Sequence, residues 1–212
     1  MFSTVTLLVP YYVFKNYLGS QTFKILLYYP QIVSSMVLIV IYKFFVDQAY
    51  PQLIETFTGN RPYGLLMNLD TQLGTLIFFS QYFTLGNGVI IYTSIMANTS
   101  PELIEAAKID GAGDLRQFWH IIIPAMYPTL VLGWMGIFTG VFSVQFYVFA
   151  FYGLNAEGHL MTISYFMTKI VMGARADQYP YVAAMGAYIT AIVTPITLLT
   201  RKYLIKLGPS ED

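Results

Sequence analysis

The chain has 212 residues, of which 56% are hydrophobic and only 10% are charged, and its formal net charge is zero. Because a soluble domain carries about 25% charged residues, this composition excludes an ordinary globular protein and predicts an integral membrane protein. The balanced charge gives no support for nucleic-acid binding, and the absence of cysteine excludes disulfides and thiolate metal sites.

The first apolar blocks alternate with polar stretches, and a membrane helix needs about 20 residues. Residues 2–14 are too few for a crossing, so we interpret them as the tail of a longer helix. Residues 25–46 are predicted to form one crossing, interrupted by Pro30 and one lysine. Residues 47–71 carry prolines, glycines and charges, which predict an external loop. The uncharged residues 73–97 are the next predicted crossing.

A polar island, residues 99–124, follows this crossing and precedes another long apolar segment. Ser100 can cap a helix, Pro101 suits the first helical position because it lacks an N–H, and Glu102 complements the positive helix end. A short helix is therefore expected to start at Ser100.

The same island contains a predicted bend. Gly111 is free to adopt a positive φ angle, so the first short helix is expected to bend or stop there. Residues 112–120 can then form a second short helix, with Asp110 as its cap. The result is a helix-turn-helix elbow, on which Ala106 and Ala107 present a face with almost no side chain.

Several residues of the island occur at fixed spacings. Glu105-Ala106-Ala107 is followed after three residues by Gly111, and then by Ile121 and Ile123-Pro124. This pattern resembles the "EAA" loop of binding-protein-dependent ABC importer permeases. Residues 108–112, with Phe118 and Pro128, make the chain most similar to the carbohydrate branch, which usually carries Leu where this chain has Ile123.

The resemblance implies an all-α fold, a polytopic membrane helix bundle of about five membrane segments. It also implies that residues 1–212 form one transmembrane permease domain, truncated at its N-terminus relative to the family, and that residues 99–124 form the coupling loop. In the family this loop is a cytoplasmic helix that sits in a cleft of the ATP-hydrolysing subunit. The residues expected to contact that subunit are Glu102, Glu105, Ala106, Ala107, Asp110, Gly111 and Ala112.

The partners implied by the resemblance are ATP-binding cassette ATPase subunits, a second permease subunit that is expected to be a different chain, and an extracytoplasmic solute-binding protein. The implied substrate is a sugar or oligosaccharide, and the implied location is the cytoplasmic (inner) membrane of a bacterium or archaeon. The chain itself is not expected to be an enzyme or to hold a cofactor or metal. It has no Gly-Lys-Ser/Thr phosphate loop, and His120 and His159 fall on opposite predicted sides of the membrane.

The remaining segments follow the elbow. Residues 121–156 are uncharged and too long for one perpendicular helix, whereas residues 181–200 form the last predicted crossing. Between them, residues 160–172 are predicted to form an external interfacial helix, with a re-entrant hairpin as the alternative. The family often has Gly-Gly-Pro where this chain has Tyr152-Gly153-Leu154, so the loop geometry there is expected to differ.

Amide side chains inside membrane helices must face something polar, because an unpaired amide in hydrocarbon is costly. Gln81, Asn87 and Gln145 are therefore candidates for binding sugar hydroxyls, and hydrogen bonds to neighbouring helices are the alternative. The aromatic rings expected to support them are Tyr82, Trp134 and Tyr147.

Lysine and arginine counts favour a cytoplasmic elbow. This orientation places seven basic residues inside, against four at or beyond the outer face. The inner ones are Lys15, Lys24, Lys108, Arg116, Arg201, Lys202 and Lys206, and the outer ones are Lys43, Arg61, Lys169 and Arg175. Two alternative functions remain open: a permease of the same superfamily for amino acids, peptides or polyol phosphates, and a membrane scaffold that transports nothing.

Overall fold

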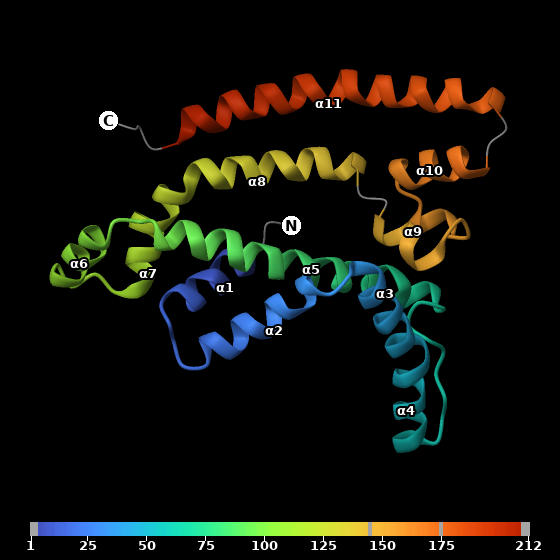
Figure 1. The fold of residues 1–212 in the computed structure, drawn as a ribbon, viewed down its shortest axis with the longest axis horizontal. Coiled ribbons are helices and arrows are strands. Elements are labelled where there is room, and N and C mark those ends of the chain that lie inside the picture. The colour runs from blue at the N-terminus through green and yellow to red at the C-terminus, as the bar shows by residue number, and fades with distance from the viewer. Residues whose placement is uncertain (1–3, 144–145, 174–175, 209–212) are drawn as a thin grey trace. The chain divides into compact units, whose positions relative to one another are not determined.

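The computed structural model describes residues 4–143, 146–173 and 176–208, and every regular element in these ranges is helical. The longer helices are α1 (Thr4–Phe14), α2 (Ser20–Ile32), α3 (Ser35–Phe44), α4 (Tyr50–Thr58), α5 (Leu69–Ala97), α6 (Pro101–Ile109), α8 (Ile123–Ser143), α10 (Ile163–Gly173) and α11 (Tyr179–Leu207). Shorter ones are η1 (Phe45–Ala49), α7 (Asp114–Gln117), η2 (Phe118–Ile122), α9 (Phe146–Tyr152), η3 (Gly158–Leu160) and η4 (Ala176–Gln178). Figure 1 shows these elements in chain order.

Four helical stretches in the described ranges are long and apolar enough to cross a membrane. They are Ser35–Thr58, Leu69–Ala97, Asp114–Gly136 and Tyr179–Leu207. The all-α membrane fold expected from the sequence is thus confirmed. Helix α1 has 11 residues, which is fewer than a full crossing needs.

The single crossing predicted for residues 25–46 is wrong. Helix α2 ends at Ile32, and α3 begins at Ser35, after Ser34 adopts an extended conformation with ψ of 130°. Serine side chains compete for backbone hydrogen bonds, and Pro30 has already removed one helical donor. Because the helix is interrupted before Ser35, the candidate membrane span lies further along the chain than predicted and runs from Ser35 to Thr58.

Two five-residue π-helical turns occur in the described part of the chain, and each ends two residues before a proline. Segment η1 precedes Pro51, and η2 precedes Pro124. A proline has no N–H to donate, and its ring clashes with the carbonyl four residues earlier. A wider turn at that point gives the ring room, so the helix continues through the proline instead of stopping.

The external loop predicted for residues 47–71 is therefore wrong over its first half. Helix continues through η1 and α4 to Thr58, where Gly59 ends it with a φ angle of 73°. The prolines and charges of this segment are typical of a loop. The π-turn before Pro51 nevertheless lets the helix continue past this proline. Only the stretch between Thr58 and Leu69 lacks regular helix.

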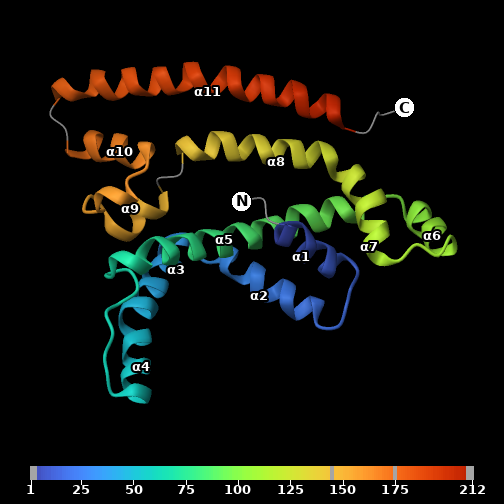
Figure 2. The same cartoon turned by 180° about the vertical axis from the view of Figure 1, so that it is seen from behind.

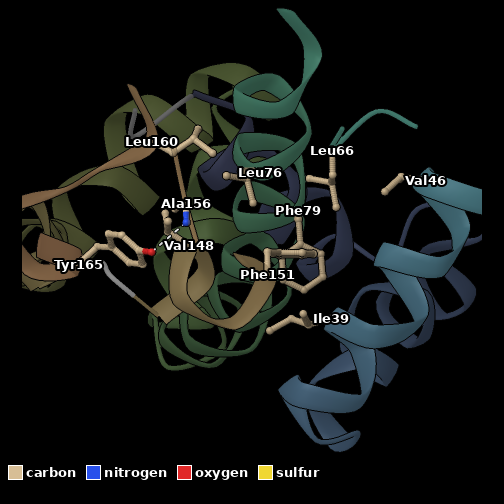
Figure 3. Packing of buried hydrophobic residues seen from close by; sticks show 10 residues of the cluster. All are labelled: Ile39, Val46, Leu66, Leu76, Phe79, Val148, Phe151, Ala156, Leu160 and Tyr165. Atoms are coloured by element: carbon tan, nitrogen blue, oxygen red, sulfur yellow. Dashed lines mark hydrogen bonds between the residues drawn. The ribbon is translucent and has the colours of Figure 1, made fainter. Parts of the chain in front are cut away.

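The structure divides into two compact units, and the second comprises residues 25–87 and 143–179. Its core is built from α3, η1, α5, α9 and the segment that leads into α10 (Figure 3). The ring of Phe79 lies 5.2 Å from that of Phe151 in an edge-to-face arrangement. Buried Tyr165 donates a hydrogen bond to Gly153 O (2.9 Å) and accepts one from Ala156 N (3.0 Å), which fixes the turn after α9.

A buried carboxylate holds the loop of this unit. Asp47 in η1 accepts a hydrogen bond from Leu66 N at 3.0 Å. Gly64 lies so close that an added Cβ would be 2.6 Å from the Asp47 carboxylate oxygen, so the position requires glycine. The non-helical stretch is thus tied to the membrane helix that precedes it.

The first unit comprises residues 1–24, 88–142 and 180–212. Its core joins α1, the C-terminal half of α5, η2 and α8 around buried residues that include Met96, Phe118 and Met126. Tyr127 in α8 donates a hydrogen bond to Leu204 O in α11 at 2.7 Å. Figure 2 shows α6 and α7 between the C-terminal end of α5 and the start of α8.

Later segments agree with the sequence analysis in outline. Helices α8 and α9 both lie within residues 121–156, which agrees with the prediction that this stretch is too long for one perpendicular helix. Residues 163–173 form α10, close to the predicted residues 160–172, and α11 extends the predicted last crossing at both ends.

Candidate functional site

The polar island folds as an elbow, which we define as residues 100–120 (Figure 1). Its first arm is α6, with Ser100 at the N-cap and Pro101 at the first helical position. The Ser100 side chain makes no capping hydrogen bond, so proline and the acidic Glu102 carry the start signal. The second arm is α7, which continues through η2 into α8.

The bend between the arms is a Schellman motif. Ala112 N donates to Ala107 O at 2.8 Å, and Gly111 N donates to Lys108 O at 3.1 Å, which satisfies the last carbonyls of α6. Gly111 has a φ angle of 77°, so the predicted positive φ is confirmed. The predicted capping role of Asp110 is wrong: it is the C-cap of α6, and Gly113 is the N-cap of α7. The Schellman bonds use the N–H groups of Gly111 and Ala112, so the second arm begins only at Asp114, after the N-cap Gly113.

The residues predicted to contact an ATPase subunit are brought together on this elbow. Glu102, Glu105, Ala106, Asp110 and Gly111 are exposed, whereas Ala107 and Ala112 are half-buried. Ala107 and Ala112 line a 260 Å³ hollow between the arms, together with Arg116, Gln117 and His120. The open small-residue face is therefore carried by Ala106, and Ala107 belongs to the inner side of the elbow.

Large apolar side chains on the elbow were missed by sequence reasoning. Ile109 is 86% exposed, and Leu103, Leu115 and Trp119 are each more than half exposed. Both arms contribute to this set, which we call the apolar knobs. Exposed large apolar residues grouped on one surface mark contact sites for other proteins. The sequence contains these apolar residues, but only the positions of the two arms show which apolar residues face inward and which are exposed.

Inward-facing residues anchor the elbow to the first unit. Ile104 of α6 packs against the core, and Phe118 is completely buried. The Phe118 ring centroid lies 4.7 Å from that of Tyr11 in α1. The Gln117 side chain is also buried and donates to Ala112 O at 2.6 Å, which joins the second arm to the bend.

A polar cluster, which we call the latch, connects the elbow to the turn after α1. Lys15 Nζ lies 2.9 Å from the Asp114 carboxylate and donates to Gln117 Oε1 at 2.7 Å. Tyr17 donates a hydrogen bond to the same carboxylate, and Tyr11 donates to Asp114 O at 2.8 Å. The hydrogen bond to the carboxylate of Asp114 raises the pKa of the Tyr17 phenol. Tyr11 of α1 and two side chains of the turn that follows it, Lys15 and Tyr17, thus hold the start of the second arm.

We expect the Lys15–Asp114 pair to stabilise the elbow measurably. The Asp114 side chain is 48% exposed, so solvent screening limits the pair to about 1 kcal/mol. Lys15→Glu and Asp114→Lys should each lower the thermal unfolding midpoint of the purified protein, and the double exchange should recover much of the loss. Additive losses in the double exchange would contradict a direct ion pair.

The candidate substrate-path residues that the structure describes are divided between the two units. Tyr82 donates to Leu26 O at 3.1 Å and so joins α5 to α2, while Tyr147 packs edge-on against Phe79 at 5.5 Å. Trp134 is half-buried in α8, within the first unit. Gln145, also a candidate, lies outside the described residues.

Gln81 and Asn87 differ from these aromatic residues. Both lie on α5 in the second unit and are exposed, and within the described ranges neither amide has a hydrogen-bond partner. Thr84, also exposed, lies midway between them along the helix. We call these three residues the polar ridge of α5.

Comparisons with known proteins agree on one family. The family described as "Binding-protein-dependent transport system inner membrane component" matches residues 1–204. The chain is 27% identical to the polygalacturonan/rhamnogalacturonan transport system permease protein YteP of Bacillus subtilis, over 77% of this chain and 50% of that protein. It is 22% identical to the arabinooligosaccharides transport system permease protein AraP of the same organism, over 85% of this chain and 58% of that protein.

A solved structure shows the same fold. A chain from the crystal structure of a bacterial ABC transporter involved in the import of the acidic polysaccharide alginate superposes with a TM-score of 0.76 at 16% identity. The match covers 97% of this chain and 73% of that chain. The present chain spans between half and about three fifths of the length of YteP and AraP.

Proposed function

Because the chain belongs to the family of binding-protein-dependent transport system inner membrane components, we propose that it is a pore-forming subunit of an ATP-driven ABC importer for a sugar or oligosaccharide. The observation that carries this proposal is the family match over residues 1–204, together with two relatives named for polygalacturonan/rhamnogalacturonan and arabinooligosaccharide transport. ATP hydrolysis is assigned to a separate subunit, and a solute-binding protein delivers the sugar from outside. The second permease subunit is proposed to be a different chain.

The elbow is the proposed docking site for the ATPase subunit. Its exposed residues include the apolar knobs, acidic residues at the start of α6, and the basic residues Lys108 and Arg116. Apolar anchors surrounded by charges are typical of a specific protein interface. The latch and Phe118 hold this surface on the first unit, so movement of the ATPase subunit is passed to the membrane helices.

An uptake assay tests the proposal. The full-length protein, reconstituted with its ATPase, second permease and binding-protein partners, is expected to accumulate a radiolabelled oligosaccharide inside vesicles only when ATP is supplied. The same vesicles with an ATPase variant that cannot hydrolyse ATP serve as control. ATP-driven uptake of an amino acid or peptide, with no uptake of any sugar, would support the alternative hypothesis of a permease of the same superfamily for those solutes. Absence of all uptake would favour the scaffold.

The polar ridge on α5 is the proposed part of the sugar path in the described residues. Unpartnered amides on a membrane helix need a polar partner, and sugar hydroxyls can supply one. Gln81→Leu and Asn87→Leu are each expected to lower the apparent affinity for the sugar by about fivefold, because each removes a hydrogen-bonding group worth roughly 1 kcal/mol. Thr84→Val is a smaller change on the same ridge, because it replaces only a hydroxyl group by a methyl group. Unchanged uptake kinetics for all tested sugars would show that these amides contact another helix instead.

A further inference from the structure

A second site lies in the first unit, away from the exposed face of the elbow. A cavity of 340 Å³ is formed by the end of α1, the turn into α2 and the last turns of α5. Its volume falls in the range of small-molecule sites, about 300–1,000 Å³. The residues that line it belong to one compact unit, so its shape does not depend on the second unit.

The cavity holds hydroxyl groups without partners. The Oγ1 atom of Thr93 is buried and makes no hydrogen bond. Ser20 is only 3% exposed, and in the part of the chain that the structure describes its hydroxyl has no partner. Both residues line the cavity. Buried hydroxyls are normally hydrogen-bonded, so the unpaired Thr93 Oγ1, in a cavity that Ser20 also lines, points to a ligand that supplies an acceptor.

The charge of the cavity defines the ligand further. Lys24 is the one charged side chain among the cavity-lining residues that the structure describes. Ser20 begins α2, whose first turn contains no acidic residue to complement its positive end. The Lys24 ammonium group and the hydroxyls of Ser20 and Thr93 can all donate hydrogen bonds to an oxyanion. The positive N-terminus of the 13-residue helix α2 also favours an oxyanion.

The same helical hairpin also offers an apolar surface. A hollow of 540 Å³ is lined by Leu8, Val9, Tyr12, Gly19 and Phe23. Gly19 lines this hollow and the next residue, Ser20, lines the polar cavity, so the two meet at the start of α2. A phosphate group attached to a hydrocarbon chain fits both surfaces, because the phosphate suits the polar cavity and the hydrocarbon chain suits the apolar hollow.

We propose that the cavity binds the phosphate group of an anionic membrane lipid, with Lys24, Ser20 and Thr93 as its ligands and the neighbouring hollow against its acyl chain. Anionic lipids are abundant at the cytoplasmic membrane surface, where the elbow is proposed to lie. The turn between the two helices also carries Lys15 and Tyr17 of the latch. A lipid bound there therefore stabilises the turn that holds the elbow. The lipid site does not depend on which solute the protein transports.

The test uses the full-length protein, assembled with its partner subunits and reconstituted in nanodiscs of either phosphatidylglycerol or phosphatidylcholine. Native mass spectrometry after detergent washing measures the lipid that stays bound. Wild-type protein should retain one phosphatidylglycerol that phosphatidylcholine does not replace. Lys24→Gln should lower that retention by about tenfold, because a charge-assisted hydrogen bond is lost. Lys24→Arg should restore it.

Two further variants separate the site from general attraction of lipid to basic residues. Lys206→Gln removes the same charge from the end of α11 and should retain the lipid. The double variant Ser20→Ala, Thr93→Val keeps the charge, removes both hydroxyls and should lose it. Equal loss in Lys24→Gln and Lys206→Gln would overturn the proposal, as would full retention in both Lys24→Gln and the double variant.

Inorganic phosphate distinguishes the two sources of the anion. In lipid-free detergent, excess phosphate should raise the unfolding midpoint of wild type only weakly, because it cannot use the apolar hollow. A large rise that depends on Lys24, with equal retention of both lipids, would overturn the lipid assignment and make free phosphate the ligand.

Discussion

Gly111→Arg is expected to reduce ATP-driven uptake by at least about tenfold while the membrane helices stay folded, since loss of a central interface contact costs about 2 kcal/mol or more. Apart from the two neighbouring residues, no atom in the described part of the chain lies within 4 Å of a Cβ added at Gly111, so the arginine has open space to extend outward. On the docking proposal, it then clashes with the ATPase subunit. Uptake and co-purification of the ATPase subunit measure the effect.

Gly111→Ala is the matched control for this variant. The positive φ angle of 77° strains alanine and arginine alike, at a cost of about 1–2 kcal/mol. Only arginine adds bulk to the docking face. If both variants lose the ATPase subunit equally, the effect comes from the backbone of the bend and not from the interface.

Ile109 gives an independent measure of the same surface. The side chain is 86% exposed and contributes little to the fold of this chain. Ile109→Ser should weaken binding of the ATPase subunit without lowering the unfolding midpoint of the isolated protein. Retention of the subunit and of uptake in both Ile109→Ser and Gly111→Arg would contradict the docking proposal.

Phe118→Ala is expected to lower the free energy of unfolding by about 3–5 kcal/mol, the usual cost of removing a buried aromatic ring. Phe118 is fully buried, where it packs against Tyr11 and joins the second arm of the elbow to α1. Thermal unfolding of the detergent-solubilised protein measures the loss. The ATPase subunit should also dissociate more readily, because the elbow loses its anchor.

The neighbouring ring supplies the control. Trp119 is 55% exposed, so Trp119→Ala removes a larger side chain with less effect on the core. Its unfolding midpoint should stay close to that of wild type, although docking should weaken because Trp119 is one of the apolar knobs. A larger loss of stability for Trp119→Ala than for Phe118→Ala would reverse the assignment of inward and outward faces.

Local signals determined the elbow. Pro101 can occupy only the first turn of a helix without loss, and Gly111 adopts the positive φ that closes a Schellman motif. These effects act over a few residues, so the sequence sufficed to predict the bend and its first arm. The apolar blocks likewise determined an all-helical membrane protein, because backbone groups in lipid must be paired within a helix.

Local signals were misleading where neighbouring turns could adapt. Pro51 was interpreted as part of a loop, yet a π-turn before it lets the helix continue to Thr58. The break before Ser35 was missed, because two serines are compatible with a helix unless tertiary contacts favour the extended state. Asp110 could cap the second arm by its position alone, but the Schellman bonds assign it to the end of the first.

Contacts between distant residues were decided by the tertiary structure alone. Lys15 and Asp114 are far apart in the sequence, and many other carboxylates could have paired with that lysine. The same is true of Ser20 and Thr93, whose unpaired hydroxyls meet only because α2 begins beside the end of α5. Periodicity and capping describe one segment at a time. Which surfaces of two segments meet depends on packing across the whole unit, and that is why the latch and the cavity appear only in the folded chain.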